Sequence, residues 1–285
     1  MKRAWMIVNA FLKTPSFLRM EQAFLAAAKK AGLVLEVKGN DAFIAKESLT
    51  GHPDAALFFD KDVRLAQRLE MSGMRLFNSS SAIAVCDDKT ATTLAMEKAS
   101  LPQPQTLLCP LTYAGVGFDS LAFLTGVGDT LGFPMVVKEA FGSFGKQVYL
   151  AQNIDELKKI VLDTAPRPML FQAFVSESFG VDLRVYVVAG RSVAAIRRVN
   201  QTGDFRANIE SGAVAYPHFL TKEEDALAVR ACRACGVDFA GVDLLFSKNG
   251  PLVCEVNSNA HFMGLIQATG VNPAEHIVQM MKEVL

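Results

Sequence analysis

Three oxygen-bearing side chains fall on one predicted hairpin. Two apolar runs flank Asn249-Gly250, a dipeptide typical of a tight hairpin turn. Because side chains alternate along a strand, Glu255 and Asn257 project to one side, and strand register can bring Asp243 beside Glu255. Two carboxylates and an amide oxygen suit Mg²⁺ that also holds substrate phosphates. A solvated hairpin edge is the alternative, although a lone charge within an apolar run is costly.

A lysine followed by a glycine-rich segment is the second candidate. Lys138 ends an apolar run, and residues 140–145 read AFGSFG. Backbone N–H groups in such a loop can bind phosphate oxygens while a buried lysine supplies a positive charge. The segment is not a Walker A loop, because Ala140 and Gln147 stand where the first glycine and the Ser/Thr are required. Taken alone, an ordinary tight turn explains it more simply.

A basic stretch after a predicted strand is the third candidate. Arg197 and Arg198 follow an apolar run, and Arg206 and Asn208 come shortly after them. Such arginines either clamp a phosphate or lie on a solvated strand edge. The stretch by itself favours the solvated edge.

The cysteines and histidines indicate little chemistry. Cys232 and Cys235 match CxxC, but there is no second pair for zinc, and the C-terminal turn of a helix disfavours a thiolate. No HExxH or G-x-S-x-G pattern occurs. Only His261 is of interest, because it closely follows Asn257.

These residues need elements that bring them together. Apolar runs typical of strands alternate with helical patterns, which predicts an α/β fold. Strands are expected at 5–8, 33–37, 55–59, 75–77, 134–138, 147–150, 169–172, 183–189, 193–199, 242–246 and 252–256, and helices at 15–31, 62–71, 81–86, 88–99, 119–131, 154–164, 222–235 and 273–285. The first part of the chain has a Rossmann-like rhythm, but no GxGxxG follows its first strand, so dinucleotide binding is not expected.

Composition narrows the class of protein. Lysine plus arginine total 29 and aspartate plus glutamate total 29, so the formal net charge is zero and we expect no nucleic-acid partner. No apolar run reaches the roughly 18 to 20 residues that span a bilayer, so we expect no membrane insertion. With 285 residues, 51% of them hydrophobic, the chain can form two or three lobes. Five irregularly spaced cysteines favour reduced thiols and a cytoplasmic location.

In their order along the chain, these elements resemble the ATP-grasp superfamily and, within it, the RimK-like ligases of the alpha-L-glutamate ligase type. The resemblance covers most of residues 80–285. Its motifs are Asp88-Lys89, Pro134-Met-Val-Val-Lys138 with the glycine-rich loop, Phe171-Gln-Ala-Phe-Val-Ser-Glu177, Asp182-Leu-Arg184, Ala194-Ala-Ile-Arg-Arg198, Gly203-Asp-Phe-Arg-Ala-Asn208, Gly241-Val-Asp243 and Glu255-Val-Asn257. One such motif would be weak, whereas eight in sequence are specific.

The resemblance implies a role for each matching residue. The nucleotide-binding set is Lys89, Lys138, Gly142, Ser143, Gly145, Gln172, Ala173, Phe174, Val175, Glu177 and Asp182. In that set the two lysines contact the ATP phosphates, the backbone of 173–175 meets the adenine, and Glu177 accepts hydrogen bonds from the ribose. The transferred phosphate and a substrate carboxylate are held by Arg198, Arg206 and Asn208. The implied magnesium ligands are Asp243, Glu255 and Asn257, with two ions expected and Mn²⁺ able to substitute.

The resemblance also implies an architecture and an activity. A Rossmann-like lobe at 1–86, a central lobe at 87–170 and a C-terminal lobe at 171–285 would clamp ATP. ATP would convert a carboxylate into an acylphosphate, and an amine would displace the phosphate to form an amide. The expected substrates are glutamate or another amino acid and an unknown acceptor, and the resemblance implies a dimer or tetramer. An ATP-binding regulator with little turnover, or a small-molecule kinase, is the alternative.

The chain departs from the family pattern where the acceptor should bind. Ser258-Asn-Ala-His-Phe262 replaces the frequent Ala-Ser-Pro-Gly, and Gly212-Ala213 replaces Gly-Gly. Ala173 stands where an acidic residue is frequent. We therefore expect His261 and Phe262 to help shape an acceptor pocket of altered specificity.

Overall fold

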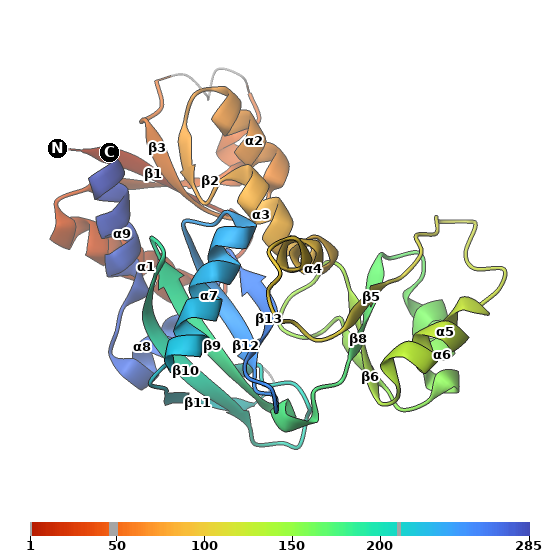
Figure 1. Ribbon diagram of the computed structural model, residues 1–285. Helices are drawn as coiled ribbons and strands as arrows, with labels where there is room; N and C mark the ends of the chain where they lie inside the picture. The colour runs from red at the N-terminus through yellow and green to blue at the C-terminus, as the bar shows by residue number, and fades with distance from the viewer. Residues whose placement is uncertain (1, 46–50, 210–211) are drawn as a thin grey trace.

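The computed structural model describes residues 2–45, 51–209 and 212–285, and the strands within them form three separate sheets (Figure 1). The first sheet is parallel, in the order β2-β1-β3-β4. Its strands are β1 (Arg3–Val8), β2 (Val34–Gly39), β3 (Ala55–Phe59) and β4 (Arg75–Phe77). Because β1 and β3 are parallel neighbours, the residues that follow them, Asn9 and Asp60, lie at the same edge of the sheet.

The helices of this part begin and end where the sequence predicts. In α1 (Pro15–Ala31), the Thr14 side chain accepts a hydrogen bond from the Phe17 N–H, and proline occupies the first helical position. Gly32 ends the helix with a φ of 71°, a conformation that glycine adopts without strain. The short η1 (Asn40–Phe43) and α2 (Val63–Met71) complete this part of the fold.

The second sheet is antiparallel, in the order β11-β10-β9-β12-β13. Its strands are β9 (Val181–Val188), β10 (Arg191–Asn200), β11 (Ala213–Pro217), β12 (Phe239–Leu245) and β13 (Leu252–Asn257). Alternate residues of β9 face opposite cores. One face packs against α3 (Ser80–Asp87), α4 (Lys89–Lys98) and α7 (Lys222–Cys235), and the other against α8 (Met263–Thr269) and α9 (Pro273–Val284).

The third sheet is also antiparallel, in the order β5-β8-β6-β7, and is set apart from the other two (Figure 1). Its strands are β5 (Thr106–Leu108), β6 (Met135–Glu139), β7 (Val148–Ala151) and β8 (Met169–Ala173). The helices α5 (Phe123–Leu131) and α6 (Ile154–Thr164) share its own apolar core. The short η3 (Ser176–Ser178) leads from β8 into the second sheet.

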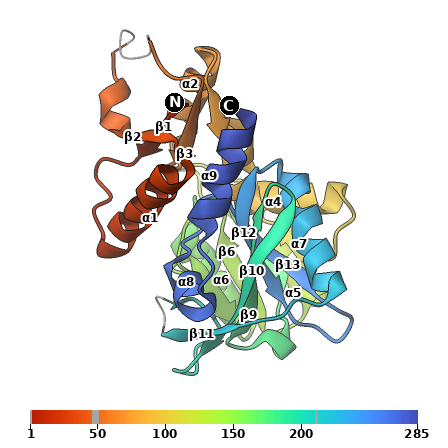
Figure 2. The ribbon, with the colours of Figure 1, turned by 90° about the vertical axis from the view of Figure 1, so that its left-hand side faces the viewer.

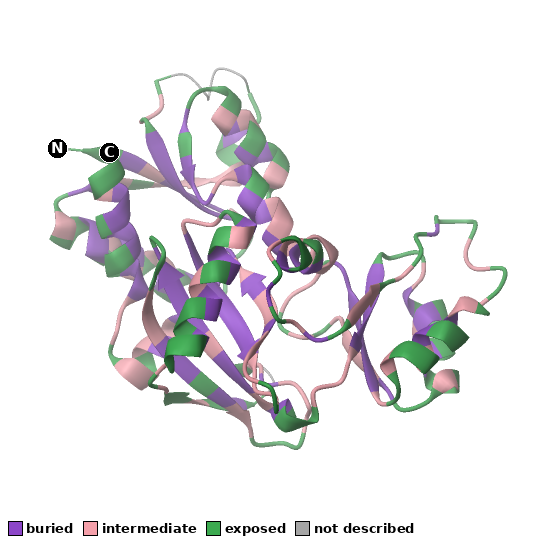
Figure 3. Cartoon of the chain, in the orientation of Figure 1, coloured by how far each residue is buried: buried purple, intermediate pink, exposed green. Residues whose placement is uncertain are grey.

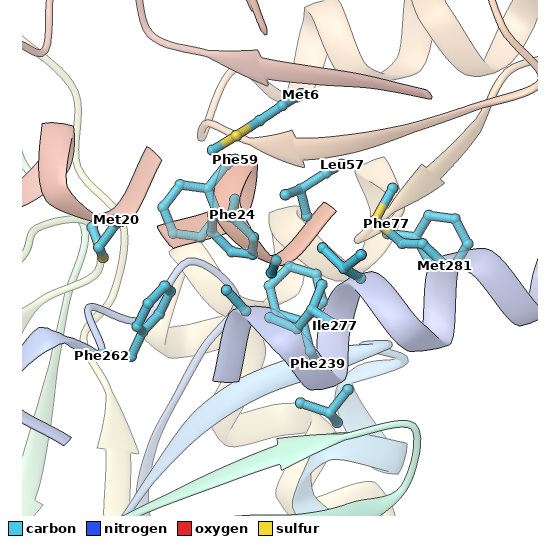
Figure 4. Packing of buried hydrophobic residues seen from close by; sticks show 14 of the residues in the cluster. Met6, Met20, Phe24, Leu57, Phe59, Phe77, Phe239, Phe262, Ile277 and Met281 are labelled. Carbon is cyan, nitrogen blue, oxygen red and sulfur yellow. The ribbon is translucent and has the colours of Figure 1, made fainter. Parts of the chain in front are cut away.

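One hydrophobic core joins the first sheet to the second. Figure 4 shows Phe24 of α1 and Phe59 of β3 facing Phe262, which directly precedes α8, and Ile277 of α9. Phe24 contacts Phe262 edge to face, with ring centroids 5.4 Å apart. The helix α9 therefore lies against α1 and holds the first sheet on the second (Figure 2).

Burial follows the layers of the fold. The strands are mostly buried, whereas the outward faces of the helices are exposed (Figure 3). In the part of the chain that the structure describes, no helix has both the length and the apolar character needed to cross a membrane.

Most predicted elements agree with the structure, and the differences involve short ones. The strands β3 and β4 and the ends of α1 are where the sequence predicts them. We did not predict β5, β11 or α8, which are too short to show a clear period. The helix expected from 119 begins at Phe123, and β12 begins three residues earlier than expected, at Phe239.

Candidate active site

A cavity of about 980 Å³ lies where the three sheets meet. This volume is at the upper end of the range for ligand pockets, which leaves room for a nucleotide and a second substrate. Predicted site residues that line it are Lys89, Lys138, Gly142, Ser143, Gly145, Gln172, Ala173, Phe174, Val175, Asp182, Arg198, Arg206, Asn208, Asp243, Glu255 and Asn257. The structure thus brings together residues that lie up to 168 positions apart, between Lys89 and Asn257.

The hairpin of β12 and β13 aligns the predicted metal ligands. Asp243 pairs directly with Glu255 across the two strands, and Gly241 pairs with Asn257. A Cβ on Gly241 would lie 2.5 Å from that of Ala260, so glycine is required where the chain leaving β13 passes close. The predicted register of this hairpin is confirmed.

Four charged side chains form a network on the second sheet: Asp182, Arg198 and Asp243, which are buried, and Arg184, which is partly buried. Arg184 donates to both oxygens of Asp243, over 2.7 Å each, and Arg198 donates to Asp243 Oδ2 over 2.9 Å. Arg198 also donates from Nε to Asp182 Oδ1 over 2.6 Å. Each arginine lies opposite an aspartate on a neighbouring strand. We call these four side chains the charge network.

The charge network fixes the ionisation of Asp243. Burial alone would raise the pKa of this carboxyl, but the guanidiniums of Arg184 and Arg198 outweigh burial, and the pKa is lowered. Arg198 is only 3% exposed. The solvated-edge interpretation of Arg198 is therefore wrong, because its charge is buried between two carboxylates.

Glu255 and Asn257 are less constrained than Asp243. The Glu255 side chain is 29% exposed, and its Oε1 lies 3.8 Å from Lys89 Nζ. Among the described residues, no hydrogen-bond partner reaches the buried Nδ2 of Asn257. Both side chains are thus available to a ligand in the cavity.

The glycine loop, residues 140–147 between β6 and β7, covers the cavity. Cationic side chains hold its backbone: Lys89 Nζ donates to the Gly142 carbonyl over 3.0 Å, and Arg206 Nη1 donates to the Gly145 carbonyl over 2.8 Å. Gly145 has a φ of 72°, and a Cβ there would lie 2.9 Å from Asn208 Oδ1. The loop therefore approaches the 204–208 segment so closely that only glycine fits. Lys138, 8% exposed, points its Nζ toward Cys254 Sγ, 3.5 Å away.

The predicted adenine segment lies at one end of the cavity. Gln172 is buried and donates to Thr106 Oγ1 over 2.9 Å, which fixes the end of β8. Residues 173–175 follow it along the cavity wall. Glu177 is not among the lining residues: it is exposed on η3, and its Oε1 lies 3.6 Å from Lys248 Nζ. The structure thus leaves Glu177 outside the cavity that holds the other predicted residues.

The other end of the cavity is formed by the first sheet and the segment after β13. His261 lines it, with Nδ1 3.4 Å from Ser16 Oγ and an edge-to-face contact to Phe144 of the glycine loop. Phe262 does not line it: the ring is fully buried against Phe24 and Tyr186. His261 therefore lines the cavity, and its contribution to an acceptor pocket stays a prediction, whereas the expectation is wrong for Phe262.

Two cavity residues carried signals that we did not use. Arg184 lies two residues after Asp182 on β9, so both share one face of the strand. Asp60 directly follows the fully buried strand β3, at the carboxyl end of a parallel sheet, where ligands bind in α/β proteins. The alternation in β9 and the charge after an apolar run could have identified them.

The CxxC cysteines belong to a hydrophobic core. Cys232 and Cys235 are buried on α7 among residues of the second sheet. Burial raises the pKa of Cys232, which disfavours the thiolate that metal binding and redox chemistry require. Residues three positions apart share one face of a helix, so the spacing of the two cysteines places both in the same core.

Comparisons with known proteins agree with this geometry. Residues 86–281 match the model of the RimK-like ATP-grasp domain. The chain is 33% identical over 219 residues to a probable alpha-L-glutamate ligase of Legionella pneumophila, a match that covers 76% of this chain and 70% of that protein. It is 32% identical over 252 residues to beta-citrylglutamate synthase B of Danio rerio, covering 85% of this chain. The match spans only 61% of that synthase.

Solved structures share the fold at low sequence identity. A D-cycloserine synthetase superimposes with a TM-score of 0.77 at 16% identity, and 99% of each chain is covered. A D-alanine–D-alanine ligase of Bacillus anthracis gives a TM-score of 0.74 at 15% identity, covering 99% of this chain and 96% of the other. The predicted fold class, an α/β ATP-grasp fold, is confirmed.

Proposed function

The chain belongs to the RimK-like ATP-grasp family, and on that premise we propose that it is an ATP- and Mg²⁺-dependent ligase that joins a carboxylate to an amine. One observation carries the proposal: Lys89, Lys138 and Glu255, from three separate elements, line one cavity beside the glycine loop. Cations, backbone amides and oxygen ligands are the groups that phosphoryl transfer requires.

The end of the β12–β13 hairpin fits Mg²⁺. Glu255 and Asn257 line the cavity, and Asp243 uses three of about four acceptor positions on the two arginines, which leaves one. In the described ranges there is no cluster of three His, Cys, Asp or Glu side chains able to bind a metal by itself, which suits an ion held in part by a nucleotide. When bound, Mg²⁺ supplies positive charge for the phosphate oxygens.

The chain's own cations would bind the ATP phosphates. Lys138 is buried and Lys89 lies between the glycine loop and Glu255, so both ammonium groups point into the cavity. The Lys89 ammonium also donates a hydrogen bond to the Gly142 carbonyl of the glycine loop. The adenine would lie against the 173–175 backbone, and Glu177 would reach the ribose only after a movement of η3.

Residues of the charge network and the 204–208 segment would bind the reacting groups. A carboxylate is unreactive toward an amine until ATP converts it into an acylphosphate; the amine then displaces phosphate and loses a proton. Arg206 and Asn208, beside the glycine loop, would hold the transferred phosphate and the substrate carboxylate. Arg198 would act from the cavity floor, with Asp182 holding it in place. A covered cavity protects the acylphosphate from water.

The finer assignments extend the proposal. The names of the relatives suggest that glutamate or another amino acid is one substrate, and the acceptor is a small molecule, a peptide or a protein tail. We include two Mg²⁺ ions, replaceable by Mn²⁺, a dimer or tetramer, a cytoplasmic location and lobe boundaries near residues 86 and 170. Each of these is a prediction.

The test is release of ADP and phosphate from Mg²⁺-ATP with amino acids offered singly and in pairs, followed by mass spectrometry. The expected product has the mass of two reactants minus water, with one phosphate released. ADP without free phosphate would indicate a kinase, and ATP binding without turnover in any mixture or cell extract would indicate a regulator.

A matched pair of variants links turnover to the cavity. Lys138→Met keeps the length of the side chain and removes its charge, so we expect at least a 100-fold loss of turnover with an unchanged melting temperature. Lys98→Met makes the same change on the exposed face of α4 and should leave turnover unchanged. Equal activities of the two variants would contradict the assignment of Lys138.

A further inference from the structure

Asp60 is a buried carboxylate with one unused oxygen at the end of the cavity opposite the predicted adenine segment. It is 9% exposed and follows β3. Its Oδ1 accepts from the Lys61 N–H over 2.7 Å and from Asn9 Nδ2 over 3.5 Å. Within the described residues, no hydrogen bond of ordinary length reaches its Oδ2. A buried acceptor without a hydrogen bond destabilises the folded protein, so a ligand that donates a hydrogen bond to Oδ2 would be bound favourably.

Asn259 presents a second unused oxygen beside Asp60. Its Nδ2 donates to the Asp60 carbonyl over 2.7 Å, and a carbonyl can only accept, so the amide orientation is fixed. Its Oδ1 is buried and, in the described part of the chain, has no hydrogen-bond partner. Two residues that line the cavity and are joined by a hydrogen bond thus each carry an unused acceptor, one of them charged.

Nearby cations of the protein are engaged elsewhere. Lys61 Nζ donates to Asp87 and, over 3.1 Å, to Ser143 Oγ, so it is directed toward the glycine loop. Burial raises the pKa of Asp60, while hydrogen bonds from the Lys61 N–H, Asn9 and Asn40 lower it less. Polar neighbours therefore compensate the buried carboxylate only in part, and no described cation forms an ion pair with it.

We propose that Asp60, Asn9 and Asn259 form a subsite for the ammonium group of an amino-acid substrate, and we call it the Asp60 subsite. A primary ammonium offers three donors and a positive charge, which match two unused acceptors, one of them anionic. Asn259 lies two residues after Asn257, so a bound amine would lie next to the predicted metal strand. The assignment rests on the proposed function, because it names the amine that the ligase would use.

A divalent metal fits this place less well. Asp60 is a lone carboxylate, and no described group of three His, Cys, Asp or Glu side chains that could bind a metal includes it. Divalent ions in proteins need more oxygen ligands than one carboxylate and one amide supply. An organic cation needs only hydrogen-bond acceptors.

The test compares Asp60→Asn with Asp62→Asn, an identical change two residues away. Asp62 is the exposed N-cap of α2, and asparagine caps a helix equally well. Melting temperatures are recorded with Mg²⁺ and a non-hydrolysable ATP analogue, with each of the twenty amino acids and with its N-acetyl form. Melting without ligand tests folding.

We expect at least one amino acid, but not its N-acetyl form, to stabilise the wild type and Asp62→Asn. Asp60→Asn should lose that stabilisation and, where turnover is measurable, show a KM for the amino acid raised about 10- to 100-fold with an unchanged KM for ATP. Asn259→Ala, which removes a neutral acceptor, should raise the same KM by about 3- to 10-fold.

Three results would overturn the subsite: equal effects of an amino acid and its N-acetyl form, equal responses of Asp60→Asn and the wild type, or no stabilisation of the wild type by any amino acid. A large fall in melting temperature of ligand-free Asp60→Asn, with Asn259→Ala unaltered in KM, would assign Asp60 a structural role. Amino-acid binding without ADP release in any pair of amino acids or in cell extract would refute the proposed function and leave the subsite intact.

Discussion

Asp243 and Asp60 are buried carboxylates on the wall of the same cavity, yet their surroundings differ. Asp243 accepts from two guanidiniums, with each oxygen engaged. Asp60 accepts from one backbone N–H and only weakly from the side-chain amides of Asn9 and Asn40, and no hydrogen bond of ordinary length reaches its Oδ2 among the described residues. A buried charge that is paired within the protein stabilises the fold without a ligand. A buried charge without a partner is stabilised only when a bound ligand supplies one.

The cavity therefore has two kinds of charged region: the charge network, whose charges pair within the protein, and the Asp60 subsite, whose acceptors are, among the described residues, free for a ligand. The charge network holds β9, β10 and β12 in register, so its charges serve the protein even without substrate. The Asp60 subsite lies where two parallel strands end and a segment from another sheet crosses them. Mutations in the charge network should therefore lower stability and activity together, and mutations in the Asp60 subsite should lower activity without lowering stability.

Removing Arg198 should have the largest effect on stability. Arg198→Ala would leave Asp182 and Asp243 facing each other with one fewer cation, at a cost of about 3 to 5 kcal/mol in the free energy of unfolding. Urea denaturation followed by circular dichroism measures this cost. The control is Arg197→Ala, since Arg197 is exposed on the opposite face of β10, over the ring of Phe246. If both variants lost a similar free energy of unfolding, the charge network would not stabilise the fold as proposed.

Changing Glu255 should reduce activity more than stability. Its ion pair with Lys89 is long and partly exposed, so Glu255→Gln should change the free energy of unfolding by less than about 1 kcal/mol. The Mg²⁺ concentration for half-maximal turnover should rise at least about 10-fold. Titration of activity with Mg²⁺ measures the shift, with Glu97→Gln on the exposed face of α4 as the control. An unchanged Mg²⁺ requirement would remove Glu255 from the metal site.

The sequence predicted the bounds of helices and strands better than it predicted which distant residues are in contact. The ends of α1 followed from Thr14, Pro15 and Gly32, because caps act within one turn of the chain. The Asp243–Glu255 register followed from one hairpin, whose partners are close in sequence. Which strands share a sheet depends on packing between distant segments, which periodicity does not encode.

The same limit explains what was missed at the site. The pairing of Asp182 with Arg198, and the contact of Asn259 with the Asp60 carbonyl, join residues from different elements. Phe262 was placed in the pocket because it adjoins His261, yet its ring turns into the core between α1 and the second sheet (Figure 4). Neighbouring residues outside regular structure can face opposite ways, so sequence adjacency did not predict their environment.

A satisfied motif far from the cavity should affect stability alone. In α7, Thr221 accepts from the Glu224 N–H over 3.2 Å, and Glu224 accepts from the Thr221 N–H over 2.8 Å. Thr221→Ala should lower the free energy of unfolding by about 1 kcal/mol and leave turnover at 25 °C unchanged. If Thr221→Ala lowered turnover without lowering stability, a residue outside the cavity would control activity, and the distinction between stabilising and substrate-binding residues would fail.

The smallest effect is the most specific, because it distinguishes the two carboxylates by pH. Burial raises the pKa of Asp60 above 3.8, so its ionised form destabilises the folded protein at pH 7, and the destabilisation disappears as the pH falls through the raised pKa. Asp60→Asn should then be more stable than the wild type at pH 7, by on the order of 1 kcal/mol, and no more stable below pH 3.8.

The pKa of Asp243 is lowered below 3.8, so its stabilising charge is fully present above that pH and is lost only under stronger acid. Asp243→Asn should therefore be less stable than the wild type at pH 7, and urea denaturation of both variants between pH 3 and 7 should give stability differences of opposite sign. If both variants were less stable at pH 7, Asp60 would be a paired charge like Asp243, and the contrast between the two carboxylates would fail.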